Sequence, residues 1–284
     1  MNRPSLAILL TLLLLCQNAW TADGLSLNLV TFNIRMPSKS DGPNEWKYRR
    51  GLVVETIKGM EPDVMGVQEA FAFQMKELDK SLPNHAYVGV GRDDGKADGE
   101  FAGIFYRSDR FELIESDTFW LSDTPFTVAS NTWDAACTRI CTWLQLREKT
   151  SKRTFSVYNA HYDHISKVAR ENSSKAIVMQ MIANEHDGKP LILMGDFNTG
   201  PSSAPMRTLF NGEEMLLFQN TLKQDGEEQA TYGGWSGRIK GRQIDYILIA
   251  SDPHTVVESG INRHHQGGRY PSDHYPVFAR VNFP

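Results

Sequence analysis

The sequence has few cysteines, which excludes several protein classes. It contains three cysteines in 284 residues, and Cys16 lies in an N-terminal segment that we expect to be removed. If Cys137 and Cys141 share one extended strand, their Cα atoms are about 13 Å apart, so a disulfide would need a bend between them. Two thiols are also too few for a structural zinc site. The chain is therefore not a disulfide-stabilised scaffold.

An excess of positive charge is also absent. The formal net charge is −4, so the chain lacks the general electrostatic signature of a protein that binds long polyanions, although a local basic patch stays open. The composition is that of an ordinary globular protein, with 40% hydrophobic residues, and the length can bury a large core. There is no internal repeat, low-complexity segment or linker, which favours one domain.

Long apolar runs are missing except near the N-terminus. Arg3 precedes a short apolar run at residues 6–15, and the small residues Ala19 and Ala22 follow it. This pattern is typical of a secretory signal peptide, and the run is too short for a comfortable membrane span. A lipid anchor on Cys16 is disfavoured because three leucines precede it where such a site needs small residues. We expect residues 1–22 to be a signal peptide, and the mature chain to be a secreted or periplasmic monomer without stable membrane insertion.

The remaining sequence alternates between buried strands and amphipathic helices at both ends and is rich in strands in the middle. This arrangement predicts two packed sheets with helices outside. The predicted helices are 46–60, 74–82, 164–186 and 202–210, and the predicted strands are 25–34, 63–69, 85–90, 101–107, 111–121, 139–147, 154–161, 191–194, 244–249 and 275–283.

Polar side chains stand at the ends of the buried strands. The strand at 191–194 runs into Gly195-Asp196-Phe197-Asn198, which taken alone is equally compatible with a simple turn. Each of the other polar residues also has a bland structural explanation. Six strand ends that all carry polar or charged side chains are harder to explain by local structure alone, because a buried unpaired charge is costly. The ends carry Asn33, Glu69, His161, Asp196 with Asn198, Asp245, and Asp273 with His274.

If these ends converge, their chemistry points to a phosphoesterase. Crowded carboxylates repel one another unless a cation neutralises them, and oxygen-rich ligation without thiolate fits Mg²⁺ or Mn²⁺. A carboxylate can activate water, while a metal and imidazolium groups neutralise the charge that develops on a phosphate. Asp245 would orient the ring of His274 by accepting from its second nitrogen.

The strand-end motifs together resemble the endonuclease/exonuclease/phosphatase (DNase I-like) superfamily, in particular its bacterial secreted members. The resemblance runs from about Leu27 to the end of the chain. It implies that residues 23–284 form one catalytic domain, a four-layer αββα sandwich of two packed, mainly antiparallel sheets with flanking helices. It also implies a metal-dependent phosphoric ester hydrolase. The motifs are Thr31-Phe32-Asn33, Val67-Gln68-Glu69, Asn159-Ala160-His161, Gly195-Asp196-Phe197-Asn198, Ile244-Asp245-Tyr246 and Ser272-Asp273-His274.

The resemblance also implies a role for each site residue. Glu69 would be the main metal ligand, with Asn33 and Asp273 close by. Asp196 would orient or deprotonate the attacking water, and Asn198 and His161 would hold the phosphate oxygens. His274 would face the phosphorus while Asp245 fixes its tautomer, and Glu100 is a candidate for the same positioning role at His161.

The substrate is less determined by the sequence. Arg139, Trp133 and Trp235 are candidate substrate contacts, although a surface ion pair explains Arg139 equally well. We expect a phosphomonoester or phosphodiester of a small or glycan-linked substrate. The alternative, a secreted nuclease acting on DNA or RNA, would need a basic groove. A non-catalytic binding protein of this fold is disfavoured because no site residue is lost. The groove would draw on Arg238, Lys240, Arg242, Arg263 and Arg269.

Overall fold

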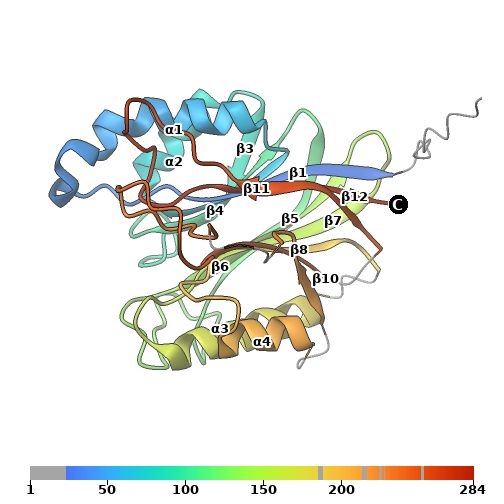
Figure 1. Ribbon diagram of the computed structural model, residues 1–284. Coiled ribbons are helices and arrows are strands. Elements are labelled where there is room, and N and C mark those ends of the chain that lie inside the picture. The colour runs from blue at the N-terminus through green and yellow to red at the C-terminus, as the bar shows by residue number, and fades with distance from the viewer. Residues whose placement is uncertain (1–23, 185–187, 213–215, 224–225, 227, 251–252) are drawn as a thin grey trace, which may run out of the picture.

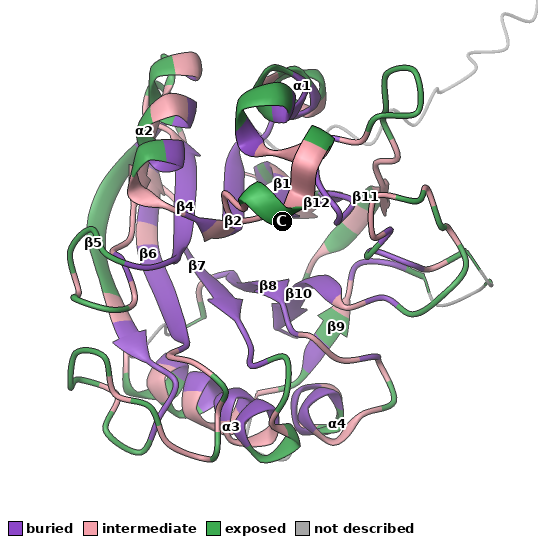
Figure 2. Cartoon of the chain, turned by 90° about the vertical axis from the view of Figure 1, so that its left-hand side faces the viewer, coloured by how far each residue is buried: buried purple, intermediate pink, exposed green. Residues whose placement is uncertain are grey.

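The computed structural model describes residues 24–284 apart from 185–187, 213–215, 224–225, 227 and 251–252. The predicted signal peptide at 1–22 lies outside the described residues. Two sheets pack face to face, and helices cover the outer face of each sheet (Figures 1 and 2). The predicted αββα sandwich is therefore confirmed.

The first sheet has six strands. Its strands are antiparallel except for one parallel pair, β1 with β2. In spatial order they are β11 (Thr255–Ile261), β12 (Val277–Phe283), β1 (Leu25–Asn33), β2 (Val64–Ala70), β4 (Phe101–Arg107) and β3 (His85–Val88).

The second sheet also has six strands and repeats this plan. Its one parallel pair is β7 with β8, and its other neighbours are antiparallel. In spatial order the strands are β5 (Phe111–Trp120), β6 (Ile140–Glu148), β7 (Thr154–His161), β8 (Leu191–Asp196), β10 (Asp245–Ala250) and β9 (Phe218–Asn220).

Helices α1 and α2 cover the first sheet, and α3 and α4 cover the second (Figure 2). α1 ends at a left-handed Glu61, and Pro62 prevents its continuation. α3 begins after Ser166, whose side chain accepts a hydrogen bond from the backbone N–H of Ala169. The helices are η1 (Lys39–Asn44, 3₁₀), α1 (Trp46–Met60), α2 (Ala72–Ser81), α3 (Lys167–Ala183) and α4 (Ala204–Asn211).

Three apolar layers hold the sandwich together. One lies between the two sheets, and one lies between each sheet and its helices. The six residues of β8 are all buried, which explains why its sequence shows no alternation of apolar and polar residues. Within the described residues, no helix is long and apolar enough to cross a membrane.

The structure adds elements that the sequence analysis did not predict. The edge strands β9 and β11 and the 3₁₀ segment η1 were missed. β11 shows mostly exposed or half-buried residues, so it lacks the apolar pattern of the inner strands. The predicted helix 164–186 is too long at its N-terminal end, because Asp163 and Ser166 form a turn before α3 begins.

Gly195 fixes the path of β8 into the polar strand end. Its φ is +143°, and a Cβ placed on it would lie 1.9 Å from the carbonyl oxygen of Ala160 on β7. We expect Gly195→Ala to destabilise the fold by more than about 2 kcal/mol, because the backbone is unsuited to a side chain and β7 would be displaced. Thermal unfolding measures this loss.

The matched control is Gly51→Ala in the middle of α1, where a Cβ meets nothing within 4 Å. This change should stabilise the chain by roughly 0.5–1 kcal/mol. Equal unfolding temperatures for the two variants would contradict the role assigned to Gly195.

Candidate functional site

The two parallel pairs bring polar strand ends to one edge of the sandwich. Asn33 ends β1 beside Gln68 of β2, and His161 ends β7 beside Asp196 of β8. Asp245 starts the antiparallel strand β10 directly opposite Asp196. A cleft of about 570 Å³ opens at this edge. Its lining includes Arg35, Glu69, Arg92, Glu100, Cys137, Arg139, His161, His164, Asp196, Asn198, Tyr232, Asp273 and His274.

Asn33 joins the two sheets at the floor of the site. Its Nδ2 donates to Oε1 of Glu69 and to Oδ2 of Asp196, both at 3.0 Å. Its Oδ1 accepts the backbone N–H of Arg35 at 3.0 Å. Both amide hydrogens are therefore used, and Asn33 orients the two carboxylates.

Asp196, His274 and Asp245 form a buried chain of ionisable groups. Nδ1 of His274 lies 3.0 Å from Oδ2 of Asp245, and its Nε2 lies 3.7 Å from Oδ2 of Asp196. Burial alone would lower the pKa of His274, but the charges of Asp245 and Asp196 hold it well above its usual range. Burial, followed by the charge of Asp245, raises the pKa of Asp196 to about 7.

His161 is held by an arginine. Nη1 of Arg139 lies 2.9 Å from Nδ1 of His161, whereas Oε2 of Glu100 lies 3.7 Å away. Because an arginine can only donate, Nδ1 is the acceptor and the ring proton lies on Nε2, which is 3.6 Å from Asp196. Arg139, rather than the predicted Glu100, thus sets the tautomer. Burial and then the charge of Arg139 hold the pKa of His161 well below its usual range.

The carboxylates of Glu69 and Asp273 face a common space. The guanidinium of Arg35 lies 3.6 Å from Glu69 and 3.8 Å from Asp273. Burial opposes ionisation of Glu69, but the charge of His274 and hydrogen bonds from Asn33 and the Met36 backbone lower its pKa.

This donor set fits a hard divalent cation. It is rich in carboxylate oxygens, and those of Asp196 and Asp245 belong to a cluster with His274 whose members all lie within 4.8 Å of one another. The protonated ring of His274 supplies positive charge to this cluster rather than a ligand atom. Burial raises the pKa of Asp273, as it does that of Asp196, so the unneutralised site holds its negative charge at a cost. Added positive charge would relieve that cost.

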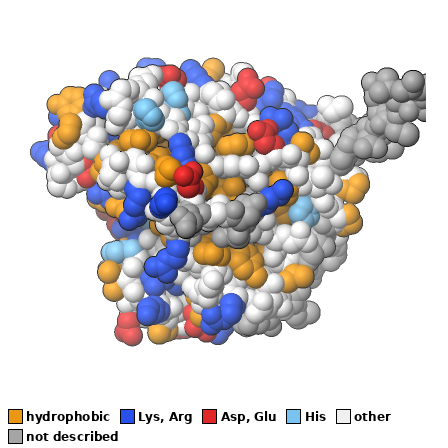
Figure 3. Space-filling view, in the orientation of Figure 1, with side chains coloured by type: hydrophobic (Ala, Val, Ile, Leu, Met, Phe, Trp, Pro, Cys, Tyr) orange, Lys and Arg blue, Asp and Glu red, His pale blue; other side chains and the backbone are white. Residues whose placement is uncertain are grey.

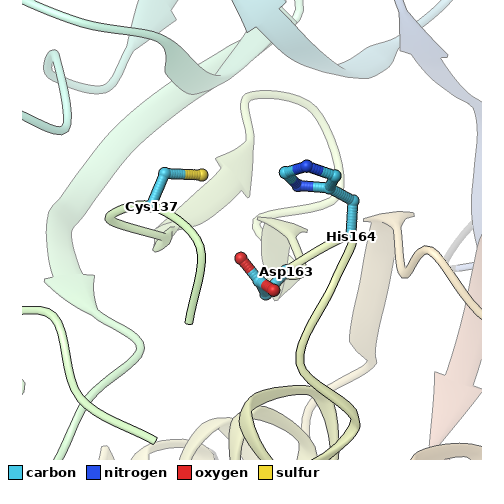
Figure 4. Close-up of side chains that lie close together, drawn as sticks. All are labelled: Cys137, Asp163 and His164. Atoms are coloured by element: carbon cyan, nitrogen blue, oxygen red, sulfur yellow. The ribbon is translucent and has the colours of Figure 1, made fainter. Parts of the chain in front are cut away.

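A second group at the cleft edge, Cys137, Asp163 and His164, also has metal-like spacing (Figure 4). Its carboxylate already accepts the backbone N–H groups of Ala136, Ile165 and Ser166. The guanidinium of Arg139 lies 3.0 Å from Nδ1 of His164 and 3.7 Å from Asp163. The resident arginine therefore disfavours a cation here.

Backbone strain is concentrated around the cleft. Arg35, Glu69 and Asn198 all have φ between +49° and +61°, a region that non-glycine residues rarely occupy. Hydrogen bonds hold these residues in place, including that from Nδ2 of Asn198 to the carbonyl oxygen of Tyr162 at 3.0 Å. Such strain is typical of functional sites, where packing fixes side chains in position.

The three candidate substrate contacts lie in different places relative to the cleft. Arg139 lines the cleft and is 5% exposed, which excludes the surface ion pair. Trp133 and Trp235 are not among the residues that line the cleft. Trp133 donates to Asp123 and packs against the layer under α3, and Trp235 lies 5.3 Å from the guanidinium of Arg49.

The five basic residues that the nuclease alternative would use are not among the residues that line the cleft. Arg263 donates to the carbonyl oxygens of Ala230 and Glu228, and Arg269 donates to that of Pro43. Arg242 lines a separate groove beside the cleft.

Sequence reasoning did not select Arg35 and Tyr232 as site residues. Arg35 comes two residues after Asn33, and this closeness to a strand-end residue was the one sign in the sequence that it could belong to the site. Tyr232 lies three residues before Trp235, in the glycine-rich segment Tyr232-Gly233-Gly234-Trp235. Its ring meets that of His274 edge-on, with 5.0 Å between the centroids. Tyr232 rather than Trp235 is therefore the aromatic residue of this segment that lines the cleft.

Comparison with known proteins gives consistent matches. The sequence profile described as "Endonuclease/Exonuclease/phosphatase family" matches residues 30–274. An endonuclease/exonuclease/phosphatase structure from Bacteroides vulgatus is similar, with a TM-score of 0.84 and 32% identity, covering 92% of this chain and 100% of that one. A mannosyl-6-phosphatase from Bacteroides thetaiotaomicron has a TM-score of 0.78 and 30% identity, covering 90% and 99%.

Nocturnin of Drosophila melanogaster is a more distant relative. It is 24% identical over an alignment of 310 positions that covers 90% of this chain and 46% of that protein. Nocturnin of Rattus norvegicus is 26% identical, over 84% of this chain and 59% of its own length. The chain thus spans roughly half the length of these curated relatives.

The pKa values of the two site histidines should be shifted in opposite directions from the ordinary histidine value. In metal-free protein, His274 should stay protonated above pH 6.5 and His161 should stay neutral below it. NMR of the ring Cε1–H signals across pH 4–9 measures both. Asp245→Asn should lower the pKa of His274, because the partner charge is lost. Two midpoints near the ordinary histidine value would contradict this electrostatic description.

The same shifts fix the sign of two contributions to stability. A histidine with a raised pKa stabilises the fold fully below about pH 6.5, and His274 loses this contribution as the pH rises through its raised value. His161 acts oppositely. As the pH falls below about 6.5, His161 binds a proton in the unfolded chain but not yet in the folded one, so the stability of the fold declines there.

Proposed function

Because this chain belongs to the endonuclease/exonuclease/phosphatase family, we propose that it is a divalent-metal-dependent phosphoesterase. Its substrate would be a phosphomonoester or phosphodiester of a small or glycan-linked molecule, attacked in line by water. The observation that carries the proposal is the convergence of Glu69, Asp196, His161 and His274 in one cleft. Asp245 is buried behind His274 and contacts its ring.

Asp196 is suited to accept a proton from the attacking water. A general base works best when its pKa lies near the operating pH, and burial brings the pKa of this carboxyl to about 7. The backbone N–H of Asn198 donates to its Oδ1 at 2.9 Å and Asn33 donates to its Oδ2, so its orientation is fixed.

The two histidines would act on the phosphoryl oxygens. His274, kept positive by Asp245, would neutralise charge that develops in the transition state. His161 would donate through Nε2, because Arg139 occupies its other nitrogen. Asn198 keeps one amide hydrogen for the same purpose after bonding to Tyr162.

The cation is proposed to be Mg²⁺ or Mn²⁺. Glu69 and Asp273 would hold it, with the Asp196, Asp245 and His274 cluster at its side. When bound, it would polarise the phosphoryl group and stabilise negative charge on it.

A small substrate is favoured over a long nucleic acid. On the face drawn in Figure 3, Lys and Arg side chains lie in separate groups with apolar and acidic side chains between them. The similarity to a mannosyl-6-phosphatase supports a sugar phosphate. The nuclease remains the alternative because the same chemistry serves both.

We also propose that the protein acts outside the cytoplasm. The support is the sequence of residues 1–22. Intact-mass measurement of the protein recovered from its native host should show loss of about 20 N-terminal residues. Recovery of the full-length chain from the cytoplasmic fraction would contradict secretion.

Activity is tested with a panel of p-nitrophenyl phosphate, bis-p-nitrophenyl phosphate and hexose 6-phosphates. Turnover should require Mg²⁺ or Mn²⁺ and disappear with EDTA. Asp196→Asn and His274→Gln should each lower kcat about 10²- to 10⁴-fold, because each removes a group that acts on the water or the phosphate.

The control variant is Glu115→Gln, which changes an exposed carboxylate on β5 that does not line the cleft. Metal-independent turnover, or none on any substrate, would refute the proposal. Digestion of plasmid and single-stranded DNA or RNA, with a steep loss of rate as salt is added, would instead identify a nuclease.

A further inference from the structure

A second groove of about 680 Å³ adjoins the cleft. Asn198 and Ile244 line both hollows, so the groove continues from the proposed reaction centre. The N-terminal turns of α3 and α4 form its other walls. One molecule bound in the cleft can therefore extend into the groove.

Arg170 is an unusual residue of this groove. It is only 9% exposed, yet the one hydrogen bond of its side chain among the described residues is from Nη1 to the carbonyl oxygen of Asp163 at 2.8 Å. No described carboxylate forms an ion pair with it. The charge of Asp163 acts on this guanidinium, and its four other donor hydrogens have no partner among the described residues, so they can bond to an anion.

Apart from the charge of Asp163, the charged residues around Arg170 are mostly basic. Lys167 and Arg242 also line the groove, and the one acid there, Glu171, pairs with Lys175 at 3.1 Å. Ser203 adds a buried hydroxyl that has no hydrogen-bond partner among the described residues. The positive ends of the α3 and α4 dipoles lie on the same groove and also favour an anion.

We propose that this groove is a second anion subsite of the enzyme. It would hold a phosphate or carboxylate that the substrate carries in addition to the phosphoryl group being hydrolysed. The inference rests on the proposed function and narrows it, because it selects substrates with two anionic groups. Arg170 and Arg242 can each grip such a group through two parallel N–H bonds.

The probes are alkane-1,n-bisphosphonates with three to eight carbons, compared with monophosphonates of equal chain length. Their C–P bonds resist hydrolysis, and the series covers the unknown distance between cleft and groove. Inhibition of p-nitrophenyl phosphate hydrolysis gives Ki, and ligand-induced thermal shift reports binding without turnover. At the best length, the bisphosphonate should bind at least about tenfold more tightly than its monophosphonate, as one added charge-assisted contact predicts.

The variants locate this advantage. The exposed pair Lys167→Gln/Arg242→Gln should reduce the ratio of the two affinities about tenfold, and Arg170→Gln should do the same if it folds. Arg207→Gln, an exposed arginine on α4 outside the groove, should keep the wild-type ratio. ω-Phosphonocarboxylates of the best length separate a carboxylate preference from a phosphate preference.

Two results would overturn the subsite. One is equal affinity for mono- and bisphosphonates at every length, and the other is an unchanged ratio in the Lys167→Gln/Arg242→Gln protein. Failure of the proposed function looks different. It gives no metal-dependent hydrolysis of any panel substrate, while the thermal-shift comparison still reports on the groove.

Discussion

The structure depends on how negative charge is held at the junction of the two sheets. Asp196 is the centre of that problem. It is buried at the end of an apolar strand, opposite Asp245, and two carboxylates in one dry place repel each other. Hydrogen bonds from Asn33 and from the backbone of Asn198, together with the positive charge of the His274 ring, offset the repulsion. The same contacts that allow the sandwich to close also leave this carboxyl with a pKa suited to proton transfer.

Much of the fold and of the site could be predicted from the sequence because apolar strands and their polar ends are local patterns. β4 and β7 were predicted to the residue, and the predicted strand-end groups lie at one edge of the sandwich, where Asn33 bonds to Asp196 and His274 to Asp245. Interactions between segments that are distant in the sequence could not be predicted from it. The choice between Arg139 and Glu100 as partner of His161 depends on a separation of under 1 Å across three strands. The same holds for Tyr232 and Trp235, which differ only in where a glycine-rich loop turns. The edge strand β11 was missed because solvent on its outer side removes the apolar signal.

The cleft and the groove divide recognition between two kinds of contact. The cleft groups are rigid, strained and mutually bonded, so they suit a reacting phosphoryl group that varies little between substrates. The groove is walled by helix ends and flexible basic side chains, which suit the variable remainder of a molecule. Members of one family can then share their chemistry and differ in substrate, because the second region changes without disturbing the first.

The first strand of the described chain pairs with the last one, β1 with β12. Asn33 and His274, which flank this pair, belong to opposite ends of the sequence. The site therefore cannot assemble until the most distant segments of the described chain have met and positioned the carboxylates. Topologies of such high contact order fold slowly. It follows that a partly folded chain, in which β12 has not yet paired with β1, cannot position the proposed catalytic groups.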